Sequence, residues 1–225
     1  MNDDAHGAAE HMDYRLTEPL ENAAPLKSVP ATPPPIPEYL EDTYWWAYLH
    51  PKAFYFFERE WVVNLILWGN MRKLTQAVMD ELTEESDSRV LQVACVYGEF
   101  SRLLAARLQQ TESQLDVVDV APIQLTNIKK KLADFDNTAF HHQDSSNLQF
   151  ADGAYDETVV FFLLHEQPED VRRKTVEQAV RVTRPGGKII FVDYHGPKKS
   201  NPMRYVMKPI LTWLEPFAMD MWRDE

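Results

Sequence analysis

The stretch VLQVACVYGEFS, Val90–Ser101, joins an apolar run, a turn with one glycine and the start of a helix. Strand–loop–helix units of this kind bind nucleotide cofactors, and several glycines normally let the loop backbone approach the ligand. This loop has Gly98 alone. The stretch therefore predicts a buried strand followed by a cofactor loop of unusual composition.

Short apolar runs alternate with helical patterns along the rest of the chain. The expected strands are Val90–Cys95, Leu115–Val120, Ala139–His142, Tyr155–Leu164 and Lys188–Tyr194. The expected helices are Pro51–Trp68, Asn70–Leu82, Phe100–Gln110, one opened by Pro122, and Pro168–Val182. This alternation predicts an α/β fold, a parallel sheet with helices on both faces. Ligands of such sheets bind at the carboxyl ends of the strands.

The composition limits the classes of function. A net charge of −12 over 225 residues argues against a general nucleic-acid binder, whose binding surface is basic. Cys95 is the only cysteine, so no internal disulfide forms and a reducing compartment is expected. The longest apolar run, Trp61–Gly69, is too short to span a bilayer. We expect a cytoplasmic protein that is soluble or peripheral to a membrane.

Composition also divides the chain into four segments. Residues 1–37 read as a disordered arm rich in acidic residues and proline, and residues 38–84 as an aromatic-rich helical lid. Residues 85–196 form the expected cofactor-binding α/β core. Residues 197–225 contain Lys198, Lys199, Arg204 and Lys208 among apolar side chains. A basic amphipathic helix there suits an anionic membrane surface, and an ordinary solvated helix is the alternative.

Two acidic positions follow expected strands. Asp119 ends the second strand, where a carboxylate can accept both hydroxyls of a ribose; the alternative is an N-cap for the helix opened by Pro122. Asp144, followed by Ser145, comes after the third strand, where an acid can accept an adenine amino group above Phe150. Together they predict a nucleoside site at the strand ends.

Four segments resemble the class I S-adenosylmethionine-dependent methyltransferases over about residues 70–195. VLQVACVYG stands where that family reads VLDVGCGTG, and VVDVAPIQL, HHQDSSNLQFADGAYDETVV and VTRPGGKIIFVDY are similar to its later motifs. The resemblance implies a Rossmann-like class I methyltransferase fold with S-adenosylmethionine as cofactor. The cofactor-binding residues that it implies are Gln92, Val93, Ala94, Tyr97, Gly98, Asp119, Val120, Asp144 and Ser145.

The departures from the family pattern cluster at one end of the cofactor. Gln92 replaces the acid that helps to hold the methionine ammonium, Ala94 and Val96 replace glycines, and Tyr97 adds a phenol. With the aromatic stretch WWAYLHP ahead of it, the chain resembles the rhodoquinone biosynthesis (RquA) family over about residues 38–215. This implies conversion of ubiquinone to rhodoquinone by exchange of a ring methoxy group for an amino group. S-adenosylmethionine would be the amino donor, with Mn²⁺ as a helper.

His165 and Tyr97 are the candidate catalytic residues. His165, after the fourth strand, is a possible base and the best candidate for a metal ligand, and Tyr97 a proton carrier or quinone contact. His141 and His142 are adjacent and point to opposite sheet faces, so they do not readily chelate one metal. No spacing typical of metal ligands is present, and the ligands stay unassigned.

The resemblance implies ubiquinone and the cytoplasmic face of the inner membrane as partners, and no nucleic acid. The aromatic lid is then a quinone tunnel, or else a packing lid without substrate contact. Two other functions stay open: a conventional S-adenosylmethionine-dependent quinone or small-molecule methyltransferase, and a non-catalytic cofactor or lipid binder. Gln92 counts against the first of these, and the retained Asp119 and Asp144 against the second.

Overall fold

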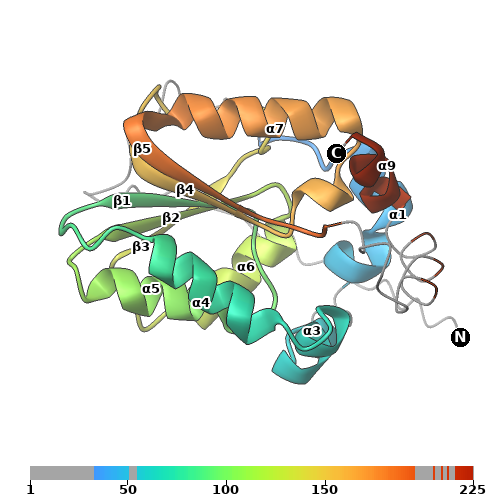
Figure 1. Ribbon diagram of the computed structural model, residues 1–225, viewed down its shortest axis with the longest axis horizontal. Helices are drawn as coiled ribbons and strands as arrows, with labels where there is room; N and C mark the ends of the chain where they lie inside the picture. Colours follow the sequence, from blue (N-terminus) through green and yellow to red (C-terminus); the bar gives the residue numbers. More distant parts are fainter. Residues whose placement is uncertain are drawn as a thin grey trace, which may run out of the picture.

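A computed structural model describes residues 33–50, 55–195, 205, 209, 212 and 216–224. Its five strands form one parallel sheet in the order β3-β2-β1-β4-β5, which confirms the predicted α/β class (Figure 1). The strands are β1 Arg89–Val93, β2 Gln114–Asp119, β3 Thr138–His142, β4 Tyr155–Phe161 and β5 Thr183–Val192.

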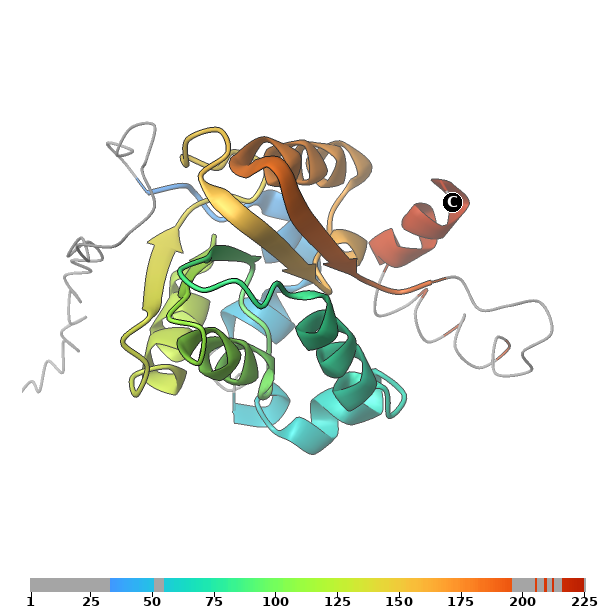
Figure 2. The ribbon, with the colours of Figure 1, turned by 60° about the vertical axis from the view of Figure 1, so that its left-hand side comes forward.

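Helices cover both faces of the sheet, as predicted. Helices α4 (Met71–Glu81), α5 (Phe100–Gln109) and α6 (Pro122–Lys131) lie on one face, and α7 (Glu169–Val182) lies on the other (Figure 1, Figure 2). Side chains alternate along a strand, so β1 contributes to two cores. Val90 packs with residues of α4, α5 and α6, while Leu91 packs with residues of α7.

Helix α5 follows the cofactor loop and fixes its far end. Phe100, Leu104 and Leu108 are spaced four residues apart and are buried, forming one apolar stripe against the sheet. The ring of Phe100 stacks on Phe161 of β4, with centroids 4.1 Å apart. Burial of each such side chain contributes about 1.5–3 kcal/mol, which anchors the helix directly behind the loop.

The fourth and fifth strands differ from the predicted bounds. β4 ends at Phe161, three residues early, because Phe162 takes a φ of +54° and turns the chain into a short 3₁₀ helix, η2 (Leu164–Glu166). β5 begins at Thr183, five residues early, and includes Gly187. A Cβ on Gly187 would collide with the Asp156 carbonyl oxygen and lie 2.8 Å from Thr183 Cγ2. The glycine is therefore required by the close approach of β4, and does not mark a turn before the strand.

The lid is a series of short helices, so the prediction of one helix over Pro51–Trp68 is wrong. It contains α1 (Glu38–Thr43), the π-helix η1 (Trp45–Leu49) and α3 (Glu60–Ile66). Extended backbone at Arg59 interrupts the helical pattern before α3, and Pro51 lies outside the described residues. Helix α9 (Pro216–Asp224) lies against the lid, where Phe217 contacts the rings of Tyr39 and Tyr44 at 6.3 Å each.

The predicted acidic arm and the predicted basic segment fall mainly on undescribed residues. Residues 1–32 and nearly all of residues 196–215, including the four basic side chains, lie outside the described ranges. Among the described residues, no helix is long and apolar enough to cross a membrane.

Candidate functional site

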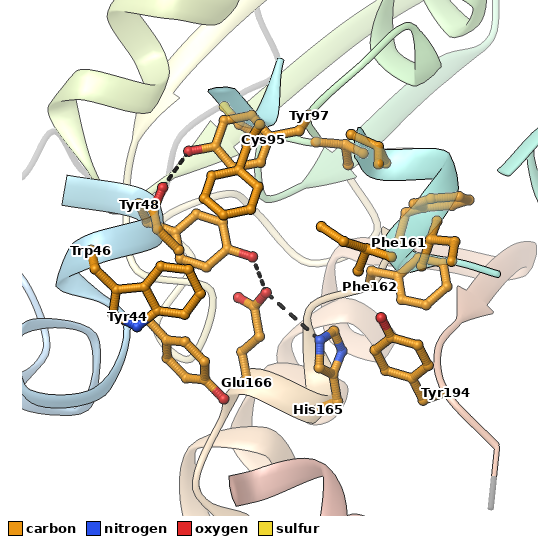
Figure 3. Close-up of a pocket in the computed structure, with 16 residues that line it drawn as sticks. Tyr44, Trp46, Tyr48, Cys95, Tyr97, Phe161, Phe162, His165, Glu166 and Tyr194 are labelled. Carbon is orange, nitrogen blue, oxygen red and sulfur yellow. Dashed lines mark hydrogen bonds and ion pairs between the residues drawn. The ribbon is translucent and has the colours of Figure 1, made fainter. Parts of the chain in front are cut away.

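Two cavities meet at the carboxyl ends of β1, β2 and β4. We call the larger the aromatic cavity; it contains about 750 Å³, open solvent at its mouth included. Its polar and aromatic wall is formed by Tyr44, Trp46, Tyr48, Phe57, Tyr97, Phe161, Phe162, His165, Glu166 and Tyr194 (Figure 3). We call the second the strand-end cavity; it contains about 590 Å³ and is lined by Tyr39, Ala94, Asp119, Val120, Gln143 and Ser145, among others. The two cavities share Tyr48, Cys95, Phe162 and Glu166.

Asp119 presents a carboxylate to the strand-end cavity. Its Oδ2 accepts a hydrogen bond from the Cys95 backbone N–H (2.7 Å) and its Oδ1 accepts one from Ala121 N–H (2.8 Å). Burial raises the pKa of Asp119 above its usual range. Each carboxylate oxygen keeps a second lone pair, so Asp119 can still accept the hydroxyl donors of a ribose. The N-cap of α6 is Ala121, and no side chain caps this helix.

The loop after β1 has backbone dihedral angles typical of glycine, although Gly98 is its only glycine. Ala94 has a φ of +71° and Gly98 a φ of +78°, both in the left-handed region. Gly98 N–H donates to Glu58 Oε2 (3.0 Å), and Lys131 Nζ donates to the Gly98 carbonyl (2.8 Å). Lys131 also forms an ion pair with Glu58. The lid and the end of α6 therefore hold the loop from two sides.

Several predicted cofactor residues do not line either cavity. Gln92 is fully buried, and its Nε2 donates to the Ala94 carbonyl (2.8 Å) and to Ser101 Oγ (2.9 Å). Its Oε1 has no hydrogen-bond partner among the described residues. Val93 belongs to the core on the α7 face of the sheet. Gln92 thus contacts the loop from within the core and does not line either cavity.

The loop after β3 contributes Ser145 to the strand-end cavity. Asp144 is not among the residues that line the cavity, and its Oδ1 accepts hydrogen bonds from both the N–H and the hydroxyl of Ser146, each at 2.8 Å. Ser145 Oγ accepts from Gln167 Nε2 (2.9 Å). The structure therefore brings Ala94, Asp119, Val120 and Ser145 together, while Asp144 caps its own loop.

Tyr97 connects the loop to the lid. Its ring is stacked between Tyr48 and Phe57, with both centroid distances at 5.7 Å. The phenol donates to the Ala47 carbonyl (2.6 Å) and accepts from Gln124 Nε2 (2.7 Å), and burial raises its pKa. A neutral phenol in contact with three lid residues and one α6 side chain thus links the loop to the lid beside the aromatic cavity.

His165 lies in a row of titratable side chains at the floor of the aromatic cavity. Its Nδ1 is 2.7 Å from Asp193 Oδ1, and its Nε2 is 3.7 Å from Glu166 Oε1. The Tyr48 hydroxyl donates to the same Glu166 oxygen (Figure 3). Because Asp193 holds an Nδ1–H, Nε2 is the acceptor nitrogen and faces Glu166. We call Asp193, His165, Glu166 and Tyr48 the proton row.

Three members of the proton row were missed in the sequence. Glu166 follows His165, and Asp193 directly follows β5, the strand next to β4 in the sheet. Positions just after adjacent strands are expected to lie close together, so the sequence does hold a signal for this contact. Asp193 also accepts from the backbone N–H groups of Leu164 (2.8 Å) and His165 (3.2 Å), which fixes η2. Tyr48 is 118 residues from Glu166 in the chain, and no local pattern predicts that contact.

No group of three His, Cys, Asp or Glu side chains within the described ranges is arranged to hold a metal ion. His141 Nε2 lies 3.0 Å from Asp116 Oδ1, whereas His142 Nε2 lies 2.9 Å from the Val120 carbonyl. The two adjacent histidines thus have separate partners. The described side chains do not fit the Mn²⁺ that the family resemblance implies.

Comparison with known proteins identifies the core. Residues 90–187 match a family model described as a methyltransferase domain. The demethylmenaquinone methyltransferase of Paenarthrobacter aurescens (strain TC1) is 31% identical over 139 residues, covering 60% of this chain and 51% of that protein. That of Staphylococcus saprophyticus is 28% identical over 134 residues, covering 60% and 56%. The chain thus spans about half the length of these curated relatives.

Solved structures agree on the fold. A SAM-dependent methyltransferase from Aquifex aeolicus has a TM-score of 0.52 and 15% identity, covering 75% of this chain and 88% of that one. The cyclase SpnF has a TM-score of 0.51 and 19% identity, covering 68% and 56%. The chain therefore has the Rossmann-like class I methyltransferase fold. Because one of these two structures is a cyclase, the shared fold leaves the reaction open.

Proposed function

We propose that this methyltransferase-fold protein binds S-adenosylmethionine in the strand-end cavity and modifies the ring of a lipid quinone in the aromatic cavity. The proposed reaction is the exchange of a ring methoxy group of ubiquinone for an amino group, which forms rhodoquinone. One observation carries the proposal: the two cavities share Tyr48, Cys95, Phe162 and Glu166. Groups bound in the two cavities would therefore meet over the proton row.

The strand-end cavity has the polar groups that a nucleoside needs. Asp119 would accept the ribose hydroxyls, and Ala94, Val120 and Ser145 would surround the rest of the nucleoside. Tyr39 and Leu40 of the lid complete the wall. S-adenosylmethionine would supply a transferable amino group, or a transferable methyl group in the conventional reaction.

The aromatic cavity suits a flat apolar ring. Its volume lies in the range of small-molecule sites, which combine apolar walls with a few polar groups. Phe57, Phe161 and Phe162 offer ring faces and edges, and His165 and Glu166 supply the polar groups. The names of the demethylmenaquinone methyltransferases support a quinone, and the loop and the WWAYLHP stretch favour ubiquinone.

Exchange of methoxy for amine requires a proton to move. The amine of S-adenosylmethionine adds to the ring carbon and methanol leaves, so a proton leaves the nitrogen and another reaches the departing oxygen. His165 Nε2, held by the Asp193 contact to Nδ1, is placed to accept the first. Glu166 and Tyr48 extend the route toward both cavities. The closed aromatic lid would exclude water from the ring.

The bond from the transferred nitrogen to Cα of the cofactor must then break. The quinone ring would act as the oxidant by taking up the N–H and Cα–H hydrogens with two electrons. Hydrolysis of the resulting imine on release would give the aminohydroquinone and the 2-oxo acid of the cofactor.

The family resemblance also implies manganese, but we route no step through a metal. The described His, Asp and Glu side chains offer no three-ligand group, and those of the proton row already contact one another. Tyr48, His165 and the two carboxylates are sufficient for the proton transfers described above.

Conventional methyl transfer to a quinone is the second candidate. The match of residues 90–187 to a methyltransferase domain and the named relatives favour it. A purely binding role accounts less well for two carboxylates, an imidazole and a phenol in a row beside a cavity, with His165 and Glu166 buried.

The test is mass analysis of ubiquinone incubated with the full-length protein and S-adenosylmethionine. Methoxy-to-amino exchange gives a lighter product, and methylation gives a heavier one. His165→Gln should abolish product formation, while His141→Gln, which changes a partly buried histidine outside the cavities, should not. An unchanged quinone in the presence of bound cofactor would overturn the proposal.

A further inference from the structure

Exposed apolar side chains concentrate on the outer surface of the lid. Eight of the twelve large hydrophobic side chains that are exposed among the described residues fall between positions 45 and 68. They are Trp45, Trp46, Tyr55, Phe56, Trp61, Leu65, Ile66 and Trp68, and we call them the lid face. Monomeric proteins rarely expose so many large apolar side chains in one segment without an interaction partner.

The lid face is continuous and reaches the aromatic cavity. Phe57 contacts both Trp46 (5.8 Å) and Phe56 (5.2 Å), and Phe56 contacts Trp61 at 6.3 Å. Trp61, Leu65 and Trp68 then line one shallow hollow on the surface. Trp46 and Ile66, both exposed, also line the aromatic cavity (Figure 3). An apolar path therefore leads from the surface into the cavity.

The charges of the described lid lie beside this face. Glu58 pairs with Lys131 and binds the Gly98 amide, and Glu60 pairs with Arg72 across 3.4 Å. No charged residue occurs from Trp61 to Met71. Trp68 is 41% exposed although its φ is +53°, a left-handed conformation that an L-residue keeps only against strain. The backbone thus directs an indole outward at the end of α3.

We propose that the lid face is a membrane-docking surface that inserts into the interfacial layer of a phospholipid bilayer. Tryptophan and tyrosine favour this layer because their rings are apolar and their N–H or O–H groups reach water. The exposed indoles of Trp45, Trp61 and Trp68 supply such rings, and Leu65 and Ile66 supply further exposed apolar side chains. Insertion would bring the mouth of the aromatic cavity to the bilayer, where a long-tailed quinone resides.

This surface differs from the basic segment that the sequence predicts for membrane contact. Attachment through lysine and arginine requires anionic lipid and weakens with salt. Attachment through the lid face does not require anionic lipid and resists salt. The link to quinone entry rests on the proposed function, whereas the docking surface itself does not.

The test is co-sedimentation of the full-length protein with phosphatidylcholine vesicles. The double variant Trp61→Glu and Leu65→Glu should lower the partition coefficient by about tenfold or more. The control Leu103→Glu and Val180→Glu changes two side chains of similar exposure on α5 and α7, and should bind as the wild type does. Binding should persist at high salt, and brominated lipid should quench the wild-type tryptophan fluorescence.

Several outcomes would overturn the docking surface. One is that the wild-type protein does not bind neutral vesicles, and another is that the lid-face variant still binds them. A third is that the wild-type protein is a dimer in solution whereas the lid-face variant is a monomer. If the double variant does not fold, the single variant Leu65→Ser and the lipid quenching of the wild type decide instead.

An activity assay separates this inference from the proposed function. The lid-face variant should lose about tenfold in turnover of long-tailed ubiquinone in vesicles while keeping turnover of a short-tailed, water-soluble ubiquinone. Equal loss with both quinones would contradict docking as the role of this face. If the wild type converts neither quinone, the proposed function fails, and vesicle binding alone still decides the docking surface.

Discussion

His165 owes its orientation to Asp193, which contacts Nδ1 and also accepts the backbone N–H groups around it. This contact leaves Nε2 facing Glu166, whose other partner is the Tyr48 hydroxyl from the lid. Tyr48 and Glu166 therefore share a hydrogen bond at the floor of the aromatic cavity, and His165 Nε2 lies 3.7 Å from the same carboxylate oxygen. The carboxylate of Glu166 is the member shared by both cavities.

Glu166→Gln keeps the size of the side chain and removes its proton affinity. We expect the turnover number to fall by about 10²-fold or more, because general acid–base catalysis contributes at that level. The matched control Glu169→Gln alters an exposed carboxylate on α7 and should leave turnover unchanged. Steady-state kinetics measures the effect, and wild-type turnover in Glu166→Gln would remove the proton row from the mechanism.

Ala94 holds a backbone conformation that suits glycine. Ala94→Gly should raise the free energy of unfolding by about 0.5–1 kcal/mol, because relief of strain exceeds the added flexibility of the unfolded chain. Ala106→Gly in α5 is the control and should lower it by about 1 kcal/mol. Denaturant unfolding distinguishes the two. A loss of stability in Ala94→Gly as large as in the control would show that the alanine is unstrained.

The proposed ribose contact of Asp119 predicts a cofactor affinity that depends on pH. Ribose hydroxyls bind the carboxylate form, and burial raises the pKa of this group, so protonation begins above the usual range for aspartate. Affinity for S-adenosylhomocysteine should therefore fall as pH drops through this pKa, by up to about tenfold per unit. Calorimetry from neutral pH downward measures how the affinity changes with pH. The Asp119→Asn variant should bind the ligand weakly, and its affinity should not change with pH. A pH-independent affinity in the wild type would place the ribose elsewhere.

Single residues were predictable from sequence where a strand end fixes them. Asp119, Ser145 and His165 follow strands and reach the cavities. Gln92 was predicted to face the cofactor, yet it lies one residue before the end of β1 and points into the core beside Ser101. Successive side chains of a strand point to opposite faces of the sheet. An error of one residue in the predicted strand therefore reverses the face assigned to each side chain.

At the scale of elements, the lid and the cofactor loop behave as one unit. Tyr97 is stacked between two lid rings, and Glu58 binds the Gly98 amide and pairs with Lys131 of α6. These contacts join residues 40 to 73 positions apart in the chain. Contacts with the lid therefore hold the loop in its conformation. In the class I methyltransferase pattern, glycines stand at these loop positions.

Tyr97→Phe tests this connection. The variant keeps both ring stacks and loses the hydrogen bonds to Ala47 and Gln124, so local opening of η1 should become easier by about 1 kcal/mol, or roughly fivefold in exchange rate. Hydrogen exchange of the amides over residues 44–49 measures this change, with amides of α5 as an internal reference. Tyr55→Phe, an exposed lid tyrosine, is the control. Unchanged exchange in Tyr97→Phe would mean that stacking alone holds the lid.

Elements of the core were more predictable than those of the lid. Period-two and helical patterns located every strand of the described sheet and helices α4 to α7, because burial imposes those periods. The start of β5 was missed because Gly187 resembles a turn signal, although close approach of Asp156 requires it. The lid was predicted as one helix because aromatic residues at nearly every position hide the break at Arg59.

At the scale of the molecule, the sheet presents the strand-end cavity and the lid adds the aromatic cavity beside it. The sequence motifs predict the first, since its residues are local to strand ends. The second depends on contacts between the lid and residues more than 100 positions away, such as Tyr48 with Glu166, which no local pattern contains. The cavity that we propose for the substrate therefore lies in the part of the fold that the sequence predicts least well.

The most direct measurement uses S-adenosylmethionine labelled with nitrogen-15 at its amino group and with carbon-13 at its methyl group. The full-length protein is incubated with ubiquinone, and the quinone product is analysed by mass spectrometry. Our account predicts a product that carries nitrogen-15, lacks carbon-13 and has lost one ring methoxy group. A product that carries carbon-13 without nitrogen-15 would contradict amino exchange and establish conventional methyl transfer.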